Sequence, residues 1–183
     1  MLSKENEENS LENNWVNLAE ERLGAEVQFA TDDFFASKEN LIRPGRGIFI
    51  ADKYTERGKW MDGWESRRKR DPGHDYCDIK LGLTGVIKGV DIDTNHFLGN
   101  HPPHASIEAC YTEETPDSNT VWHEVLEKVS LGPGQQNIFE IKDDNLWSHI
   151  RLHIYPDGGV ARLRVYGEVK VDWEKEDQDK TID

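Results

Sequence analysis

The sequence predicts an all-β protein, an antiparallel β-sandwich of the jelly-roll kind. Strand-like runs dominate the chain, and clusters of Gly, Pro, Asn and Asp separate them. Helical periodicity is nearly absent, and the best candidate is a short piece around residues 16–22. About nine short strands at this spacing are typical of a sandwich in which each sheet buries one face.

The predicted strands cover most of the chain between residues 24 and 171. In chain order they are 24–30, 47–52, 76–82, 85–94, 105–111, 120–127, 136–142, 148–155 and 160–171. The last two are the clearest, because apolar and polar side chains alternate along both and the sequence Pro-Asp-Gly-Gly lies between them. We therefore expect one buried face that includes Val90, Ile92, Ile150, Leu152, Leu163 and Val165.

One domain is predicted over residues 15–171, between two acidic tails. Residues 1–14 carry one Lys and four Glu, and residues 172–183 carry two Lys and six acidic residues. Both tails are expected to be solvated and flexible, because charged segments with little apolar surface do not fold alone. The chain has 6 Trp, 5 Tyr and 6 Phe, enough large side chains to build a core.

Charge and cysteine content exclude several classes of protein. With 22 Lys and Arg against 36 Asp and Glu, the net charge is −14, so no nucleic-acid partner is expected. No apolar run is long enough to span a membrane, and the N-terminus has no secretory signal. Only Cys77 and Cys110 are present, so we expect free thiols and a cytoplasmic location.

Histidines gather in the loop that follows the predicted strand 85–94. Strand alternation places Asp91 and Asp93 on one face, away from the core, and His96 and Asn100 follow in a loop stiffened by two prolines. Imidazole and carboxylate groups together suit proton transfer or binding of a divalent metal. The alternative is a solvated loop whose histidines bond to the backbone, and the residues alone leave both readings open.

A second charged cluster lies at residues 52–70. Here Lys53, Glu65, Arg67 and Arg68 are spaced around two tryptophans, an arrangement that suits a pocket for a carboxylate or a urea-like group. The alternative is that the tryptophans belong to the core and the charges form surface ion pairs that contribute little to stability.

Three long stretches resemble one known family. Residues 21–42, 44–109 and 148–169 closely resemble the module of allantoicase (allantoate amidinohydrolase), and the string KYTERGKWMDGWESRRKR at 53–70 is the most specific part. The similarity covers about residues 15–171. It implies a galactose-binding-domain-like jelly roll and a hydrolase that converts allantoate and water to ureidoglycolate and urea in purine degradation.

The resemblance also raises the question of partners. Allantoicases usually carry two copies of this module, whereas this chain has one, most similar to the first copy. We expect a homo-oligomer or a separate second allantoicase module to replace the missing one. Two alternatives remain, a non-catalytic module that binds a small anion or sugar, and a half-enzyme that is inactive without its second module.

Roles for individual residues follow from this resemblance and from side-chain chemistry. His96 with Asp93 is expected to act as an acid–base pair, with Glu65 as a second catalytic carboxylate. The residues expected to bind substrate are Arg67, Arg68, Lys53 and Asn100. A divalent metal held by His96, Asp91 and Asp93 is an alternative, although their spacing matches no metal motif. His101 and His104 are set aside, and the two clusters are expected to meet at one end of the sandwich.

Overall fold

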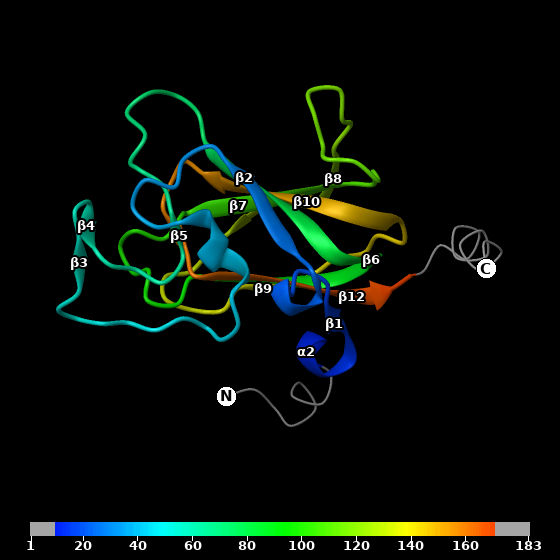
Figure 1. Cartoon of the computed structure of the whole chain (residues 1–183), viewed down its shortest axis with the longest axis horizontal. Helices are drawn as coiled ribbons and strands as arrows, with labels where there is room; N and C mark the ends of the chain where they lie inside the picture. The colour runs from blue at the N-terminus through cyan, green and yellow to red at the C-terminus, as the bar shows by residue number, and fades with distance from the viewer. Residues whose placement is uncertain (1–9, 171–183) are drawn as a thin grey trace, which may run out of the picture.

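Antiparallel strands make up nearly all of the regular structure in the computed structural model, which describes residues 10–170 (Figure 1). Its short helices are α2 (Leu11–Asn14), η1 (Glu21–Leu23) and η2 (Lys38–Ile42). Its strands are β1 (Val16–Asn17), β2 (Glu26–Ala30), β3 (Tyr54–Thr55), β4 (Gly58–Lys59), β5 (Trp64–Glu65), β6 (Asp75–Asp93), β7 (His104–Cys110), β8 (His123–Ser130), β9 (Ile138–Glu140), β10 (Leu146–Tyr155), β11 (Gly159–Val160) and β12 (Arg162–Val169). The all-β prediction is confirmed.

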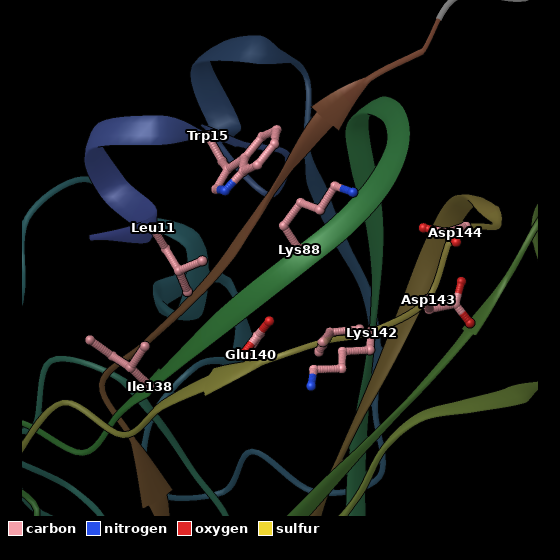
Figure 2. A pocket seen from close by; sticks show the side chains of 9 residues that line it. Leu11, Trp15, Lys88, Ile138, Glu140, Lys142, Asp143 and Asp144 are labelled. Atoms are coloured by element: carbon pink, nitrogen blue, oxygen red, sulfur yellow. The ribbon is translucent and has the colours of Figure 1, made fainter. Parts of the chain in front are cut away.

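Strand β6 belongs to both layers of the sandwich. The predicted strands 76–82 and 85–94 are one strand, which turns back on itself near its middle (Figure 2). Two glycines let neighbouring backbone approach β6 near this turn, because a Cβ on Gly85 would lie 2.4 Å from the carbonyl oxygen of Glu168 and one on Gly82 would lie 2.8 Å from that of Leu23. Both ends of β6 therefore lie at the same end of the molecule (Figure 1).

The two halves of β6 organise the two layers. In one layer β10 pairs with the first half of β6, at Ile150↔Ile79, and β7 and β8 continue the sheet outward while β2 flanks β6. In the other layer β12 pairs with the second half, at Leu163↔Ile92, with β1 beyond it and β9 on the opposite side. All of these pairs are antiparallel.

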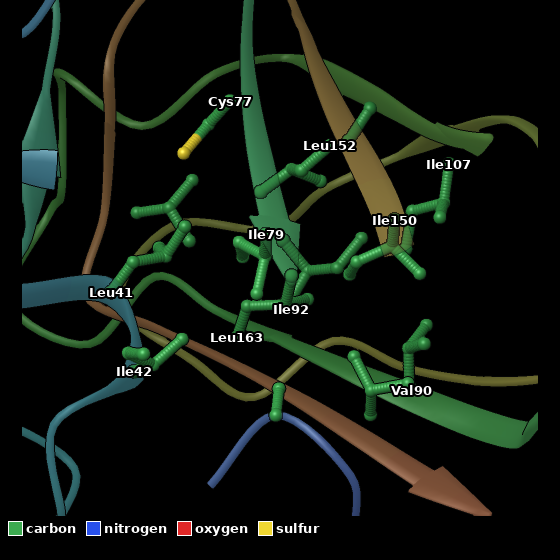
Figure 3. Packing of buried hydrophobic residues seen from close by; sticks show 14 of the residues in the cluster. Leu41, Ile42, Cys77, Ile79, Val90, Ile92, Ile107, Ile150, Leu152 and Leu163 are labelled. Carbon is green, nitrogen blue, oxygen red and sulfur yellow. The ribbon is translucent and has the colours of Figure 1, made fainter. Parts of the chain in front are cut away.

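The hydrophobic core lies between these layers. Figure 3 shows Ile79, Ile150 and Leu152 of one layer against Ile92 and Leu163 of the other. The six residues predicted to share a buried face are all inaccessible to solvent: Val90, Ile92, Ile150, Leu152, Leu163 and Val165. The expectation of free thiols is also confirmed, since Cys77 and Cys110 are unpaired and buried, and burial raises the pKa of both.

Residues 43–60 form an extended arm in place of the predicted strand 47–52 (Figure 1). Gly45 and Gly47 have φ angles of 76° and 92°, which interrupt an extended backbone. The apolar side chains that suggested a strand, Ile48, Phe49 and Ile50, remain exposed instead of packing on the core. The tip of the arm is the β3–β4 hairpin.

The chain around the ends of the domain also differs from expectation. The short helix predicted near residues 16–22 is replaced by α2 at 11–14 and η1 at 21–23, with β1 between them. Most of the two predicted acidic tails, 1–9 and 172–183, lies outside the described residues. Within the described part, none of the helices is long and apolar enough to cross a membrane.

Candidate functional site

Loops from distant parts of the sequence converge at the end of the sandwich where β6 begins and ends (Figure 1). One cavity there, of about 500 Å³, is called the Glu65 cavity. It is lined by Phe35, Glu65, Ser66, Arg68, Lys69, Gly99, Asn100, His101, Pro103, Pro156, Asp157 and Gly158. Glu65 and Arg68 of the 52–70 cluster thus meet Asn100 of the loop after β6 in one cavity.

A second cavity, of about 700 Å³, adjoins the first and is called the basic cavity. It is lined by Asp32, Phe35, Arg67, Arg68, Lys69, Arg70, Asp71, Pro72, Gly73 and His74. Phe35, Arg68 and Lys69 line both cavities, so Arg68 can reach a ligand in either. Four consecutive cations make this the part of the site most suited to an anion.

Glu65 is held in place by strand pairing and by Asn100. β5 pairs with β11 at Gly159↔Glu65. Trp64, the other residue of β5, is completely buried. Asn100 Nδ2 donates a hydrogen bond of 3.0 Å to Glu65 Oε2. Burial raises the pKa of Glu65, although the Asn100 bond opposes that rise. The group is therefore suited to donate a proton at a higher pH than an exposed glutamate.

The loop that carries Asn100 is fixed by close backbone packing. Gly159 N donates to the Asn100 carbonyl oxygen at 2.9 Å. A Cβ on Gly159 would lie 2.0 Å from the ring of Phe97, and one on Gly158, whose φ is 132°, would lie 2.5 Å from the Asn100 oxygen. Glycine at both positions lets the 156–159 turn approach the Asn100 loop and so sets the position of Asn100 beside Glu65.

The cationic side chains of the basic cavity differ in whether a protein group already pairs with them. Arg67 pairs with Asp32, Nε to Oδ2 at 3.0 Å, and lies over the ring of Phe34. Lys69 pairs with the buried Asp75 at 2.8 Å. Within residues 10–170, the guanidinium of Arg68 has no hydrogen-bonding or ion-pairing partner, and its side chain is exposed. Arg68 is therefore the guanidinium best placed to bind a carboxylate.

The structure does not bring the remaining predicted residues into these cavities. Asp93 is bound by Arg46, with Nε at 2.8 Å and Nη2 at 3.2 Å, and not by His96. His96 is exposed, with a φ of 70°, and stacks on Phe49 of the arm at 5.6 Å between ring centroids. Lys53 lies over the ring of Trp60. The expected acid–base pair is thus replaced by the Arg46–Asp93 ion pair and a ring stack.

The structure does not support the metal assignment to His96, Asp91 and Asp93 either. Among the described residues, no group of three or more His, Cys, Asp or Glu side chains could hold a metal ion. Asp93 is neutralised by Arg46, and Asp91 Oδ2 accepts a hydrogen bond from Gln136 at 2.8 Å. Burial raises the pKa of Asp91 to about 6, with the charge of Asp93 adding to the effect. Asp93 is thus engaged by Arg46 and Asp91 by Gln136, although the second oxygen of Asp91, Oδ1, is buried without a hydrogen-bond partner in the described part of the chain.

Sequence reasoning missed two residues that line the Glu65 cavity. His101, which was set aside, has Nδ1 2.6 Å from the Leu98 carbonyl oxygen, so Nδ1 donates and Nε2 is the nitrogen left for other contacts. Lys69 is not among the residues predicted to bind substrate, although it lies in the 52–70 cluster. The signal for His101 was its position directly after Asn100, since a loop that brings one side chain to a cavity also brings its neighbours.

Another cavity, of about 590 Å³, lies between α2, the returning half of β6 and β9 (Figure 2). It is lined by Leu11, Trp15, Lys88, Ile138, Glu140, Ile141, Lys142, Asp143 and Asp144. It contains none of the predicted site residues, and its charges are mixed. The ammonium of Lys88 lies 5.4 Å from the ring centre of Trp15, which makes this groove part of the packing of the N-terminal segment.

Comparison with known proteins agrees with this architecture. The profile of the allantoicase repeat matches residues 16–170. The chain belongs to the allantoicase family. A probable allantoicase of Photobacterium profundum is 51% identical over 170 residues, which are 92% of this chain and 52% of that protein. Probable allantoicase 1 of Burkholderia mallei is 52% identical over 160 residues, 87% of this chain and 48% of that protein.

Solved allantoicases have the same fold. One allantoicase structure matches with a TM-score of 0.80 at 35% identity, and the Saccharomyces cerevisiae allantoicase matches with 0.77 at 37%. Each match covers 93% of this chain and 55% of the solved chain. A carbohydrate-binding module from Clostridium perfringens matches at 17% identity with a TM-score of 0.56, which shows the galactose-binding-like jelly-roll fold alone. The chain spans about half the length of the allantoicases that it matches.

Proposed function

We propose that this chain is one module of an allantoicase and hydrolyses allantoate to ureidoglycolate and urea in purine degradation. The observation that carries the proposal is the half-buried Glu65, held by Asn100 in a cavity that Arg68 also lines. Membership in the allantoicase family supports the choice of substrate. The activity is a proposal for this chain because it spans about half of its relatives.

The chemistry of allantoate matches the groups in the cavity. The molecule is a carboxylate whose α-carbon carries two ureido groups, and the reaction breaks one of the two C–N bonds. Arg68 binds the carboxylate through its two parallel N–H donors, since no protein group competes for them in the described part of the chain. Arg67, already paired with Asp32, adds positive charge nearby.

Glu65 supplies the proton that the leaving group needs. A ureido nitrogen leaves as urea only if it is protonated as the C–N bond breaks. Burial keeps the Glu65 carboxyl protonated to a higher pH than an exposed glutamate, and Asn100 holds it in one orientation. Glu65 is therefore the general acid of the proposed reaction.

The partner of this module is proposed to be a second copy of the chain. Relatives that match at about 50% identity are about twice as long, and a second copy of the module would need a contact surface on this one. The arm presents such a surface, with Ile48 59%, Phe49 42%, Ile50 41% and Tyr54 68% exposed. Four exposed large apolar side chains on one protruding segment indicate a contact surface between copies.

A binding module without catalysis is the second candidate. It is favoured by the four cations of the basic cavity, which suit any small anion, but it does not explain why Glu65 is half buried and hydrogen bonded. The sugar-binding alternative rests on the fold alone. A cytoplasmic location is also proposed, on the basis of two free cysteines and no disulfide in the described residues.

Urea release from allantoate by the purified full chain tests the proposal. The assay compares wild type with Glu65→Gln, which keeps the shape and the bond to Asn100 but has no acidic proton. It is run with and without a divalent metal ion, and allantoate binding is measured by calorimetry. Urea release by wild type that is lost in Glu65→Gln supports the proposal. Allantoate binding without urea release indicates a binding module. If an oligomeric chain shows neither binding nor urea release, the chain is a half-enzyme that needs its second module.

A further inference from the structure

Three side chains form a hydrogen-bonded chain on the outer face of the β6–β10–β7 layer. His153 of β10 has Nε2 2.5 Å from Glu108 Oε1 of β7, and its Nδ1 lies 2.8 Å from His74 Nε2. His153 lies opposite Ser106 and Tyr76 in the strand register, and Glu108 is the next residue on the same face of β7. Strand pairing thus aligns Glu108 with His153, and His74 directly precedes β6.

With His153 in its neutral form, the chemistry of these groups assigns the protons. A carboxylate only accepts hydrogen bonds, so the proton between Glu108 and His153 lies on His153 Nε2. In neutral His153, Nδ1 is then an acceptor, so His74 donates from Nε2. In neutral His74, Nδ1 is left without a proton, an assignment that follows from the hydrogen-bond network. The chain therefore ends in a basic nitrogen.

The surroundings of His74 favour its neutral form. Burial lowers the pKa of His74, the charges of Lys128 and Lys69 lower it further, and Asp75 opposes them. The rings of Tyr155, His153 and Tyr76 lie 4.5, 5.0 and 6.5 Å from the His74 ring. A neutral imidazole with one nitrogen already used as a donor is ready to accept a proton at the other.

His74 also lines the basic cavity, the neighbour of the Glu65 cavity. No hydrogen bond to its Nδ1 occurs among residues 10–170. We propose that His74 is the base of the reaction and that His153 and Glu108 are positioning residues that hold its Nδ1 unprotonated and directed to the ligand. This inference rests on the proposed function and adds a proton acceptor to it.

The proton transfers balance with Glu65 as the acid. His74 Nδ1 takes the N–H proton of the ureido group that stays. The electron pair of that N–H bond forms a C=N bond to the α-carbon as the C–N bond to the other ureido group breaks. The departing nitrogen takes the Glu65 proton and leaves as urea. Water then adds to the C=N carbon, its proton returns to Glu65, and His74 returns its proton to nitrogen. Allantoate and water become ureidoglycolate and urea, and both residues are regenerated.

Arg68 explains how one substrate can meet both groups. Glu65 lines one cavity, His74 lines the other, and Arg68 lines both. A substrate whose carboxylate is bound by Arg68 presents its two ureido groups to opposite sides. The two identical groups of allantoate thereby receive different roles, one as leaving group and one as electron source.

Three variants of the full chain test this inference. His74→Gln retains an amide that can bond to His153 but has no base, and we expect urea release to fall by about 10²-fold with allantoate affinity changed only a few-fold. Glu108→Gln removes a negative charge that stabilises the protonated form of His74. The pKa of His74 should fall, so the acidic limb of the kcat profile should move to lower pH. His123→Gln, an exposed histidine at the start of β8, is the matched control. Unchanged kcat in His74→Gln, or an unmoved acidic limb in Glu108→Gln, overturns the proposal.

Nitrogen-15 NMR of the wild-type histidines tests the inference independently of turnover. Unprotonated Nδ1 and protonated Nε2 are expected for His74, and the Nδ1 resonance should shift when allantoate is added. An Nδ1-protonated His74, or a resonance that saturating allantoate leaves unchanged, overturns the inference even if the enzyme is active. If wild type releases no urea but the expected tautomer and shift are observed, the proposed function fails and the allantoate-contacting His74 stands.

Discussion

Asn100 donates a hydrogen bond to the carboxyl group of Glu65, 35 residues earlier in the chain, and this contact lowers a pKa that burial raises. Removing the donor leaves burial unopposed. In Asn100→Ala we therefore expect Glu65 to stay protonated to higher pH, so the alkaline limb of the kcat profile should move upward. Asn119→Ala, in the exposed loop before β8, is the control and should leave the limb in place. A downward shift would show that Glu65 is not the titrating acid.

Arg68 should contribute to substrate affinity more than to the chemical step. A charge-assisted bond to a carboxylate contributes about 1.5–3 kcal/mol, so Arg68→Ala is expected to weaken allantoate binding by about 10- to 100-fold. Calorimetry and the ratio of KM to kcat measure this effect. Arg43→Ala removes the same charge from an exposed position outside both cavities and should bind normally. Equal losses in the two variants would mean that only net charge matters.

Asp91 makes stability depend on pH in a defined direction. Its pKa is raised from 3.8 to about 6, so the folded state holds the proton more tightly than the unfolded state. The stabilisation is complete below about pH 4 and is lost as pH rises through 6, by about 3 kcal/mol for two pKa units. Urea unfolding at several pH values should show this loss in wild type and not in Asp91→Asn. The exposed Asp144→Asn should retain it.

The arm should control assembly. Replacing Ile48 by Glu puts a charge into the proposed contact, and the lost apolar burial should weaken self-association by about 10-fold or more. Sedimentation velocity across a concentration series measures the change. Val121→Glu is the matched control, because Val121 is 70% exposed but lies outside the arm. A wild-type chain that stays monomeric at high concentration would contradict the proposal directly.

Local periodicity was sufficient for the core. Side chains two residues apart share a face of a strand, so the alternation around Val90, Ile92 and Ile150 predicted which side would be buried. The same rule placed Asp91 and Asp93 on the opposite side. It could not show that arm and loop segments cover that side, and both carboxylates are in fact buried.

Loops and links between strands could not be predicted in this way. The partner of Asp93 is Arg46, 47 residues away, and nothing in the local pattern distinguished it from the nearby His96. Glu108, His153 and His74 come from three segments, and the register of β7 with β10, together with the turn before β6, brings them together. Of the predicted site, Glu65, Arg68 and Asn100 do meet around one cavity, because the loops that carry them lie at the same end of the sandwich.

The doubled-back course of β6 couples the two layers during unfolding. Its first half bonds to β10 and β2 and its second half to β12 and β9, so neither layer can separate without disrupting a strand that the other layer also uses. The amide hydrogens of both halves should therefore exchange with solvent at similar, slow rates, through one cooperative opening of the whole domain. Both ends of this protected strand reach the loop end of the molecule. The loops that line the two cavities are thus attached to the strand that we expect to open last, which limits how far local fluctuations can displace them.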